Sequence, residues 1–115
     1  MRVIGKELNP GRLNKYVDIL RQDGEDNRVG GRRSETLRLV RVAQVWASIT
    51  NVSGSERFES NQLQAELTHR ITIRYRKDIT RQNKIRYGER MFNIRYIVDW
   101  QEKKRFLILH VAEEV

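Results

Sequence analysis

The stretch that decides the fold is HRITIRYR, residues 69–76, in which apolar and basic side chains alternate. The apolar set is Ile71, Ile73 and Tyr75, and the basic set is Arg70, Arg74 and Arg76. A side-chain period of two is typical of a β-strand that buries one face and exposes the other. The pattern therefore predicts a half-buried strand whose arginines point away from the core.

Toward the C-terminus the pattern predicts three further strands, at 84–87, 90–99 and 105–112. In the first two, basic side chains lie opposite apolar partners, and these are Lys84, Arg86 and Arg95. Tyr87 to Arg90 reads as a hairpin turn, and Trp100 to Lys104 as the next turn. The last strand contains FLILHVA, which is apolar on both faces, so we expect it to be the most buried.

Two more strands are predicted before residue 69, at 14–22 and 36–52. In the first, Leu20 lies on the face opposite Val17 and Ile19. Asp23 to Glu35 reads as a loop that lacks apolar anchors, and we expect it to be mobile in the isolated subunit. Residues 1–12 read as an extended N-terminal arm, since they contain a strong turn signal, Asn-Pro-Gly.

The residues from Ser53 to Thr68 differ in character from the strands around them. They open on Ser-Gly-Ser-Glu, which fits a helix capping box. However, Phe58 lies on nearly the opposite helical face from Leu63 and Leu67, so one barrel surface cannot bury all three. The segment also carries a net charge of −2 in a chain of net +8. We predict a marginal helix or a loop that packs poorly on its own subunit and becomes ordered against a partner.

These elements predict one domain, residues 1–115, built mainly of β-structure. Five to six strands joined by hairpins are typical of a small antiparallel β-barrel. One long loop or short helix, 53–68, is inserted between two strands of this barrel. A connection of that length is long by ordinary loop statistics and tends to be functional.

Most of the excess charge lies in residues 69–96, which hold nine basic side chains and two acids, a net of +7. A face of this kind fits a negatively charged partner, either nucleic acid or an acidic protein surface. The simpler alternative is a solvated face whose arginines pair with acids of the same chain. Between the two functional readings we favour protein contacts, because most of the cations are arginine, which pairs geometrically with carboxylates.

Several classes of site are not expected in this chain. It has no cysteine, and His69 and His110 stand alone, so neither a disulfide nor a metal site is predicted. No nucleotide or catalytic motif occurs, so we expect no catalytic residue, no cofactor and no enzymatic activity. No apolar run could span a membrane and no secretory signal is present, which indicates synthesis in a cytoplasm without membrane contact. Trp46 and Trp100 read as core or interface anchors.

Three blocks of the sequence resemble the phage head–tail joining family, the small head-closure or stopper proteins of tailed bacteriophages. They are VWASITNVSGSERFES from Val45, QAELTHRITIRYRKDIT from Gln64 and RYGERMFNIRYIVD from Arg86, followed by a polar turn and a final apolar strand. Glu89 departs from the family pattern, since a second glycine is common there. A turn that needs a positive φ at that position would be strained.

The resemblance implies a structural virion protein, a β-barrel subunit of a head–tail connector. Such subunits form a sixfold or twelvefold ring in the virion neck, below a portal or adaptor protein and above the tail or a tail-completion protein. The ring closes or lines the channel through which packaged double-stranded DNA passes. The resemblance implies no catalysis.

Two sets of residues are the candidate contact sites. The subunit or partner interface set is Arg70, Arg74, Arg76, Lys84, Arg86, Arg95, Glu56, Phe58 and Glu59. The channel segment set is Ser53, Gly54, Ser55, Glu56, Arg57 and Phe58.

Two other functions remain possible from the sequence. One is a tail-completion protein of the same neck. The other is a sequence-nonspecific single-stranded nucleic-acid binder of the OB type, in which Tyr75, Tyr87 and Tyr96 would stack on bases. Alternation argues against the second, because Tyr75 falls on the same face as Ile71 and Ile73.

Overall fold

The computed structural model describes residues 12–23, 28–29, 32–33, 38–52 and 67–114. Eight strands are present in these ranges, with one short 3-10 helix between the last two. The elements are β1 (Lys15–Asp23), β2 (Arg28–Val29), β3 (Arg32–Arg33), β4 (Arg38–Asn51), β5 (His69–Arg74), β6 (Lys84–Tyr87), β7 (Arg90–Asp99), η4 (Trp100–Glu102) and β8 (Phe106–Glu113).

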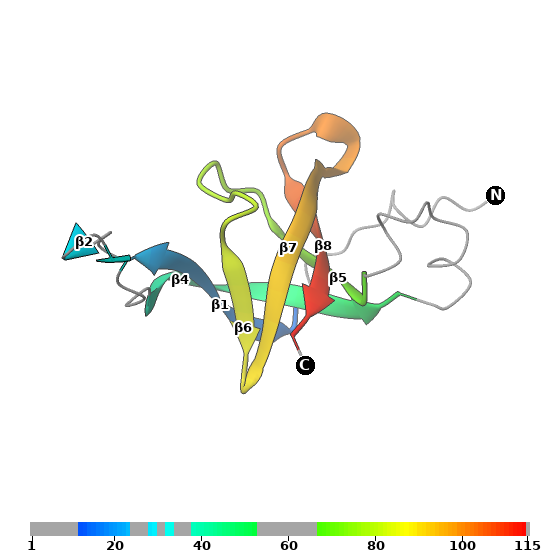
Figure 1. Cartoon of the computed structure of the whole chain (residues 1–115). Helices are drawn as coiled ribbons and strands as arrows, with labels where there is room; N and C mark the ends of the chain where they lie inside the picture. The colour runs from blue at the N-terminus through cyan, green and yellow to red at the C-terminus, as the bar shows by residue number, and fades with distance from the viewer. Residues whose placement is uncertain (1–11, 24–27, 30–31, 34–37, 53–66, 115) are drawn as a thin grey trace.

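Six of the strands close into one barrel, in the order β1-β4-β5-β8-β7-β6 (Figure 1). Every neighbouring pair is antiparallel, and β6 returns to β1 through the pairing of Lys84–Arg86 with Asp18–Leu20. Closure removes most exposed strand edges, which is how small all-β domains avoid edge-to-edge association. The predicted antiparallel barrel is therefore confirmed.

The inner faces of the strands form one apolar core. Ile71 and Ile73 have no exposed surface, and Tyr75 packs against the same cluster, whereas Arg74 is exposed. The other buried members are Val17, Ile19, Ala47, Ile79, Ile85, Phe92, Ile94, Leu107, Leu109 and Val111. The alternation predicted for 69–76 is confirmed, although the strand itself ends at Arg74.

A second apolar cluster lies on the outer face of β8. Phe106 packs there with Leu13 and Trp100, and the partly buried Ile108 completes the group. The rings of Trp100 and Phe106 meet edge to face at 6.2 Å between centroids. β8 buries side chains on both of its faces, as predicted, and has no exposed residue. β5 is buried to a similar extent, so the last strand does not stand out as the most deeply packed.

β1 and β4 extend as a two-stranded ribbon beyond the barrel. Their pairing runs from Lys15 with Ala47 to Asp23 with Arg38, with a bulge between Ile19 and Leu20. Figure 1 shows the two strands running together past β6 toward β2. β6 pairs with β1 over three residues only, so the far end of the ribbon has no third strand among the described residues.

The interval from Asp23 to Glu35 is not a plain loop, and this part of the sequence prediction was wrong. β1 includes Asp23, and β2 pairs with β3 in a small antiparallel ladder, Arg28 with Arg33 and Val29 with Arg32. A run of polar residues gives little apolar periodicity, so such a short ladder leaves no pattern in the sequence. The rest of the interval lies outside the described residues, and its mobility stays a prediction.

The inserted segment lies outside the described residues at 53–66, and the N-terminal arm lies outside them at 1–11. The last two residues of the predicted inserted segment, Leu67 and Thr68, are part of the barrel. Leu67 is buried, Val52 N donates to Thr68 O, and Thr68 N donates to Val111 O. The expectation that Leu67 packs poorly on its own subunit was therefore wrong, because strand pairing begins earlier than the apolar pattern suggests.

Two turns at opposite ends of the barrel use left-handed backbone. Gly88 has φ +62°, and Glu89 is not among the residues with positive φ, so the turn has the type II′ form that favours glycine at its first central position. The strain considered for Glu89 is absent. In the turn that follows β7, Gln101, Glu102 and Lys104 have φ near +54°.

No helix among the described residues is long and apolar enough to cross a membrane.

Candidate functional site

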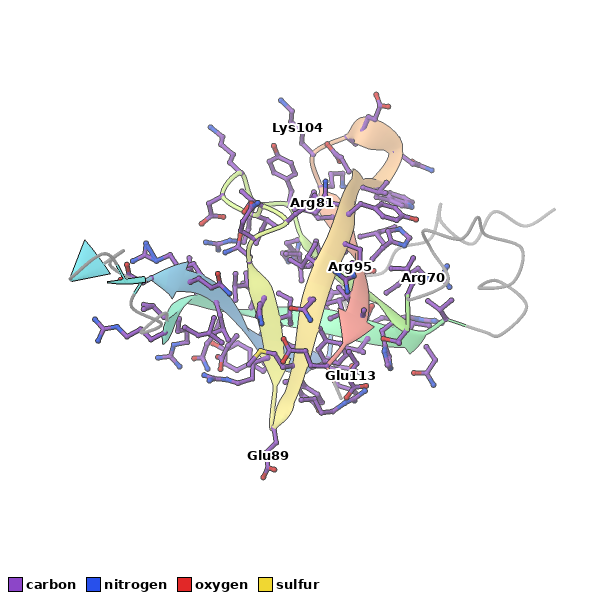
Figure 2. All side chains as sticks on the ribbon, viewed as in Figure 1. Arg70, Arg81, Glu89, Arg95, Lys104 and Glu113 are labelled. Atoms are coloured by element: carbon purple, nitrogen blue, oxygen red, sulfur yellow. The ribbon has the colours of Figure 1, made fainter. Side chains whose placement is uncertain are left out.

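The basic side chains predicted as a contact surface lie on the outside of the barrel, and Figure 2 labels two of them, Arg70 and Arg95. Arg74 and Arg95 are exposed, and the other four are half-buried: Arg70, Arg76, Lys84 and Arg86. They come from β5 and the residues just after it, from β6 and from β7, and β8 separates β5 from β7 in the barrel, so they do not form one patch. Strand alternation placed them outward, but their grouping depends on which strands are neighbours.

Asp18 is the acid at the centre of one charged network. Its Oδ2 accepts hydrogen bonds from Arg86 Nε at 3.1 Å and Nη2 at 2.8 Å, and its Oδ1 accepts one from Gln44 Nε2 at 2.8 Å. Arg41 Nη1 lies 3.9 Å from the same Oδ1. Burial alone would raise the pKa of Asp18, but these hydrogen bonds and positive charges outweigh it and lower the pKa. The network joins β6, β1 and β4.

A second network lies where β5, β7 and β8 meet. Arg90 donates from Nε and Nη2 to the two carboxylate oxygens of Glu113, at 2.8 and 3.0 Å. Arg90 Nη2 also lies 3.3 Å from His69 Nε2, and His69 Nδ1 lies 2.8 Å from Thr68 Oγ1. Because arginine can only donate, His69 Nε2 must accept and the proton sits on Nδ1. Burial lowers the pKa of His69, Glu113 opposes this and Arg90 reinforces it.

Two further ion pairs involve basic residues of the predicted set. Lys84 Nζ donates to Glu114 Oε2 at 2.6 Å. Arg76 donates to both oxygens of Asp78, at 2.9 and 2.8 Å, within one turn of the chain. Three of the six predicted basic contact residues, Arg76, Lys84 and Arg86, therefore have carboxylate partners in the same chain. The simpler sequence alternative, internal pairing of a solvated face, holds for these three.

Sequence reasoning did not identify the acids of these networks. Asp18 is 68 residues from Arg86, and Glu113 is 23 residues from Arg90. The sequence does place each acid on the outer side of a predicted strand, but strand order is also needed to pair an acid with a base. Register was the missing quantity, because it decides which outward side chains stand opposite one another.

Arg70 and Arg95 lie near an aromatic stack on the outer face. Tyr96 stacks on His110 with centroids 4.3 Å apart and planes at 14°, and His110 is also the register partner of Arg70. Arg95 lies at the irregularity in β7 between Ile94 and Tyr96 and is exposed. Arg70, His110 and Tyr96 lie side by side on the neighbouring strands β5, β8 and β7.

The tyrosines do not form an open stacking platform. Tyr75 and Tyr87 pack against the core cluster, and Tyr96 is engaged with His110. An OB-type binder needs exposed aromatic rings that accept bases. The arrangement therefore argues further against the single-stranded nucleic-acid alternative.

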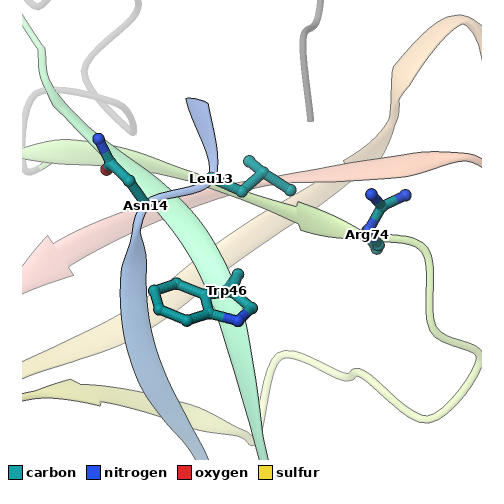
Figure 3. A pocket seen from close by; sticks show the side chains of 4 residues that line it. All are labelled: Leu13, Asn14, Trp46 and Arg74. Atoms are coloured by element: carbon teal, nitrogen blue, oxygen red, sulfur yellow. The ribbon is translucent and has the colours of Figure 1, made fainter. Parts of the chain in front are cut away.

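The two tryptophans have different environments. Trp100 is buried in the outer cluster, as expected of a core anchor. Trp46 is 55% exposed and lies against Tyr16 of β1, with ring centroids 4.7 Å apart. Figure 3 shows Trp46 beside a shallow hollow that Leu13, Asn14 and Arg74 also line. Exposed, paired aromatic rings beside an arginine have the composition of an interface hot spot.

The remaining sequence predictions concern residues that the structure does not describe or sites that it does not contain. Ser53, Gly54, Ser55, Glu56, Arg57, Phe58 and Glu59 lie outside the described residues. In the described part of the chain, no group of three or more His, Cys, Asp or Glu side chains could hold a metal ion.

Comparison with known proteins gives the family. The sequence profile of the family described as phage head completion protein matches residues 8–114. Protein SF1141 of Shigella flexneri 2a has a solved structure that is similar with a TM-score of 0.72 at 28% identity, covering 91% of this chain and 96% of that one. No curated protein sequence matches the chain.

A second solved structure has the same fold. It is a chain of the virion of a native gene transfer agent particle, with a TM-score of 0.63 at 22% identity, covering 89% of this chain and 94% of that one. The profile match begins before β1 and ends after β8, so it includes every strand of the barrel. The chain belongs to the phage head completion protein family.

Proposed function

We propose that this head completion protein is a connector subunit that forms a closed ring in the virion neck and closes or lines the DNA exit channel. The observation that carries the proposal is the family match over residues 8–114. The likeness to a chain of a gene transfer agent virion supports it, since that chain has the same barrel and belongs to a particle. The proposed ring is sixfold or twelvefold.

The charge arrangement supports a channel role more than a DNA-gripping role. A wall of unpaired cations would hold the duplex by counterion release and slow its passage. Arg76, Lys84 and Arg86 instead have carboxylate partners in the same chain. Cations that already have carboxylate partners attract DNA less strongly, so the duplex can slide through the ring while protein partners supply the specific contacts.

The contacts of the ring are assigned to the exposed basic positions and the inserted segment. Arg74 and Arg95 are the exposed members of the predicted basic set. The segment 53–66, which includes Glu56, Phe58 and Glu59, carries the negative charge that complements them on a neighbouring subunit. In the proposed order, a portal or adaptor protein lies above the ring, and the tail or a tail-completion protein lies below it.

A head-completion assay in the parent phage tests the function. Phage that lack the gene should package DNA but release it, giving empty, tailless heads, and the supplied protein should restore filled, tailed particles. Electron microscopy of the restored necks should show one ring of this barrel between the portal and the tail. Filled and tailed particles made without the protein would refute the proposal.

The same images separate the remaining alternatives. A ring at the tail end of the neck would indicate a tail-completion protein. A gel shift with single-stranded DNA tests the OB-type alternative, which requires tight binding that weakens steeply with salt. Binding of that kind, without a ring in the neck, would favour the nucleic-acid binder.

We expect the free protein to form rings only weakly until a portal-type platform concentrates it.

A further inference from the structure

We propose that the ring subunits also meet through a strand contact, in addition to the charged contacts proposed above, in which the β1–β4 ribbon of one copy docks on the free edge of β7 in a second copy of the chain. The inference rests on the proposed ring and names the surface that would build it. Two kinds of observation carry it, the unpaired strand edges and the exposed apolar side chains.

The barrel leaves two long strand edges unpaired among the described residues. β5 pairs with β4 only over Ala47–Asn51, so residues 38–46 of β4 have no partner on that side. β6 pairs with β7 only over Arg90–Asn93, so the backbone of residues 96–99 has no strand partner on the β6 side. An exposed edge presents a row of N–H and C=O groups that can accept another strand.

The exposed large apolar side chains coincide with these two edges. In the described part of the chain they are Tyr16, Leu39, Val42, Trp46 and Val98. Four of the five lie on the ribbon, and the fifth lies on β7. Such side chains are ordinarily scattered over a monomer, whereas a group along a projecting ribbon marks an interaction surface.

One antiparallel register matches the two edges in both shape and charge. If Leu39 stands opposite Val98, then Arg38 stands opposite Asp99. The first pair joins two apolar side chains that are 37% and 38% exposed in the free subunit. The second pair joins opposite charges, and cross-strand pairs of both kinds stabilise sheets. A second copy of this chain therefore fits the β4 edge without any other partner.

The aromatic pair of the ribbon extends the contact beyond the paired edges. In this register Trp46 stands opposite Met91, where β6 already pairs with β7, so its ring would contact side chains of the neighbouring barrel and not the strand edge. Trp46 and Tyr16 pack on each other, so their orientation is fixed before docking. Rings held in this way lose little conformational freedom on binding, which favours tight contacts.

The two edges belong to different parts of the molecule, and this determines the symmetry. A contact between unlike surfaces is head to tail and closes into a ring if the rotation between copies allows it. A contact between like edges would instead stop at a dimer. The inferred contact therefore has the symmetry that a connector ring requires.

The chain has no cysteine, so the contact can be tested by crosslinking introduced thiols. The variant with Leu39→Cys and Val98→Cys together, treated with a short bismaleimide in completed heads, should give a ladder of multimers up to the ring. Each single variant should stay monomeric. The matched control, Leu39→Cys with Glu89→Cys, should give no ladder, because Glu89 lies at the tip of the β6–β7 turn (Figure 2).

A second measurement does not depend on the crosslinker. Trp46→Gln should reduce head completion at least tenfold while leaving the melting temperature of the free subunit nearly unchanged. Thr50→Gln, an exposed position on the same strand where β5 already covers this edge of β4, should complete heads normally.

The outcomes separate this inference from the proposed function. A ring seen in the neck, together with no ladder or with normal assembly of Trp46→Gln, would overturn the inferred contact and leave the connector function standing. Dimers formed by a single variant alone would show that like edges meet, which also overturns it. The absence of any ring would overturn the proposed function itself.

Discussion

Asp18 and Arg86 close the barrel: the carboxylate on β1 accepts two hydrogen bonds from the guanidinium on β6, at 3.1 and 2.8 Å, across the seam where the last strand of the barrel order meets the first. Only three residue pairs join these strands, so the side-chain contact reinforces a short ladder. The side chain of Asp18 is 16% exposed, which limits its screening by water.

The first prediction concerns this seam. Asp18→Asn should destabilise the protein by about 1–2 kcal/mol, because hydrogen bonds to a charged group contribute more than neutral ones. Denaturant unfolding measures the loss. Since the folded pKa of Asp18 is lowered, its contribution is present above the ordinary value near 3.8 and is lost as the pH falls through the folded value.

A pair with the same chemistry provides the control. Arg76 and Asp78 also form a two-bond ion pair, but Asp78 is half exposed and only two residues away. Asp78→Asn should cost less than about 0.5 kcal/mol, as exposed pairs usually do. If both variants lost the same free energy of unfolding, the Asp18–Arg86 pair would contribute no more than an ordinary exposed ion pair.

The second prediction concerns pH and His69. Its pKa in the folded protein lies below the ordinary value of 6.5, chiefly because the ring is buried. The unfolded chain therefore binds the proton more readily, so stability is complete above 6.5 and falls as the pH drops toward the folded pKa. His69→Gln should flatten the melting temperature between about pH 7 and pH 5.

The chain has one other histidine, His110, which is the matched control. His110→Gln should retain the acid sensitivity of the original protein in that range. The effect of Asp18 and Glu113 lies at lower pH, because both are carboxylates with lowered pKa values. A His69→Gln variant with an unchanged pH profile would contradict the prediction.

The third prediction concerns the β6–β7 turn. Gly88 has φ +62°, and a Cβ placed there would meet no atom within 4 Å. Gly88→Ala should therefore cost about 1–2 kcal/mol through the backbone alone. Gly88→Asn should cost less, since asparagine tolerates this conformation better, and Glu89→Gly should change little. Calorimetry of the three variants checks the order, and equal losses for Ala and Asn would contradict it.

The fourth prediction concerns the inserted segment and its end. Phe58→Ala and Glu59→Lys should leave the melting temperature of the subunit nearly unchanged and reduce the yield of closed, DNA-retaining heads. Leu67→Ala should do the reverse, costing about 2–5 kcal/mol, because Leu67 is 4% exposed. Thermal melts and the head-completion assay give both readouts. Loss of several degrees in Phe58→Ala, with normal assembly, would show that this residue is core.

The local pattern of the sequence was enough to predict the strands of the barrel and which face of a strand is buried. The alternation around Ile71 and Ile73 predicted which side of β5 is buried, and Gly88 predicted the hairpin. Two local readings failed. The β2–β3 ladder was too short and polar to leave a period, and Leu67 belongs to the barrel although it was assigned to the inserted segment.

The contacts of the outward side chains were decided only by the tertiary structure. Alternation is a property of the backbone itself, so a short window of sequence determines that Arg86 and Asp18 point outward. Whether they meet depends on strand order, register and closure between segments 68 residues apart. The sequence alone therefore determined a barrel with a basic exterior, and the packing of its distant strands decided which charges are paired and which edges stay open.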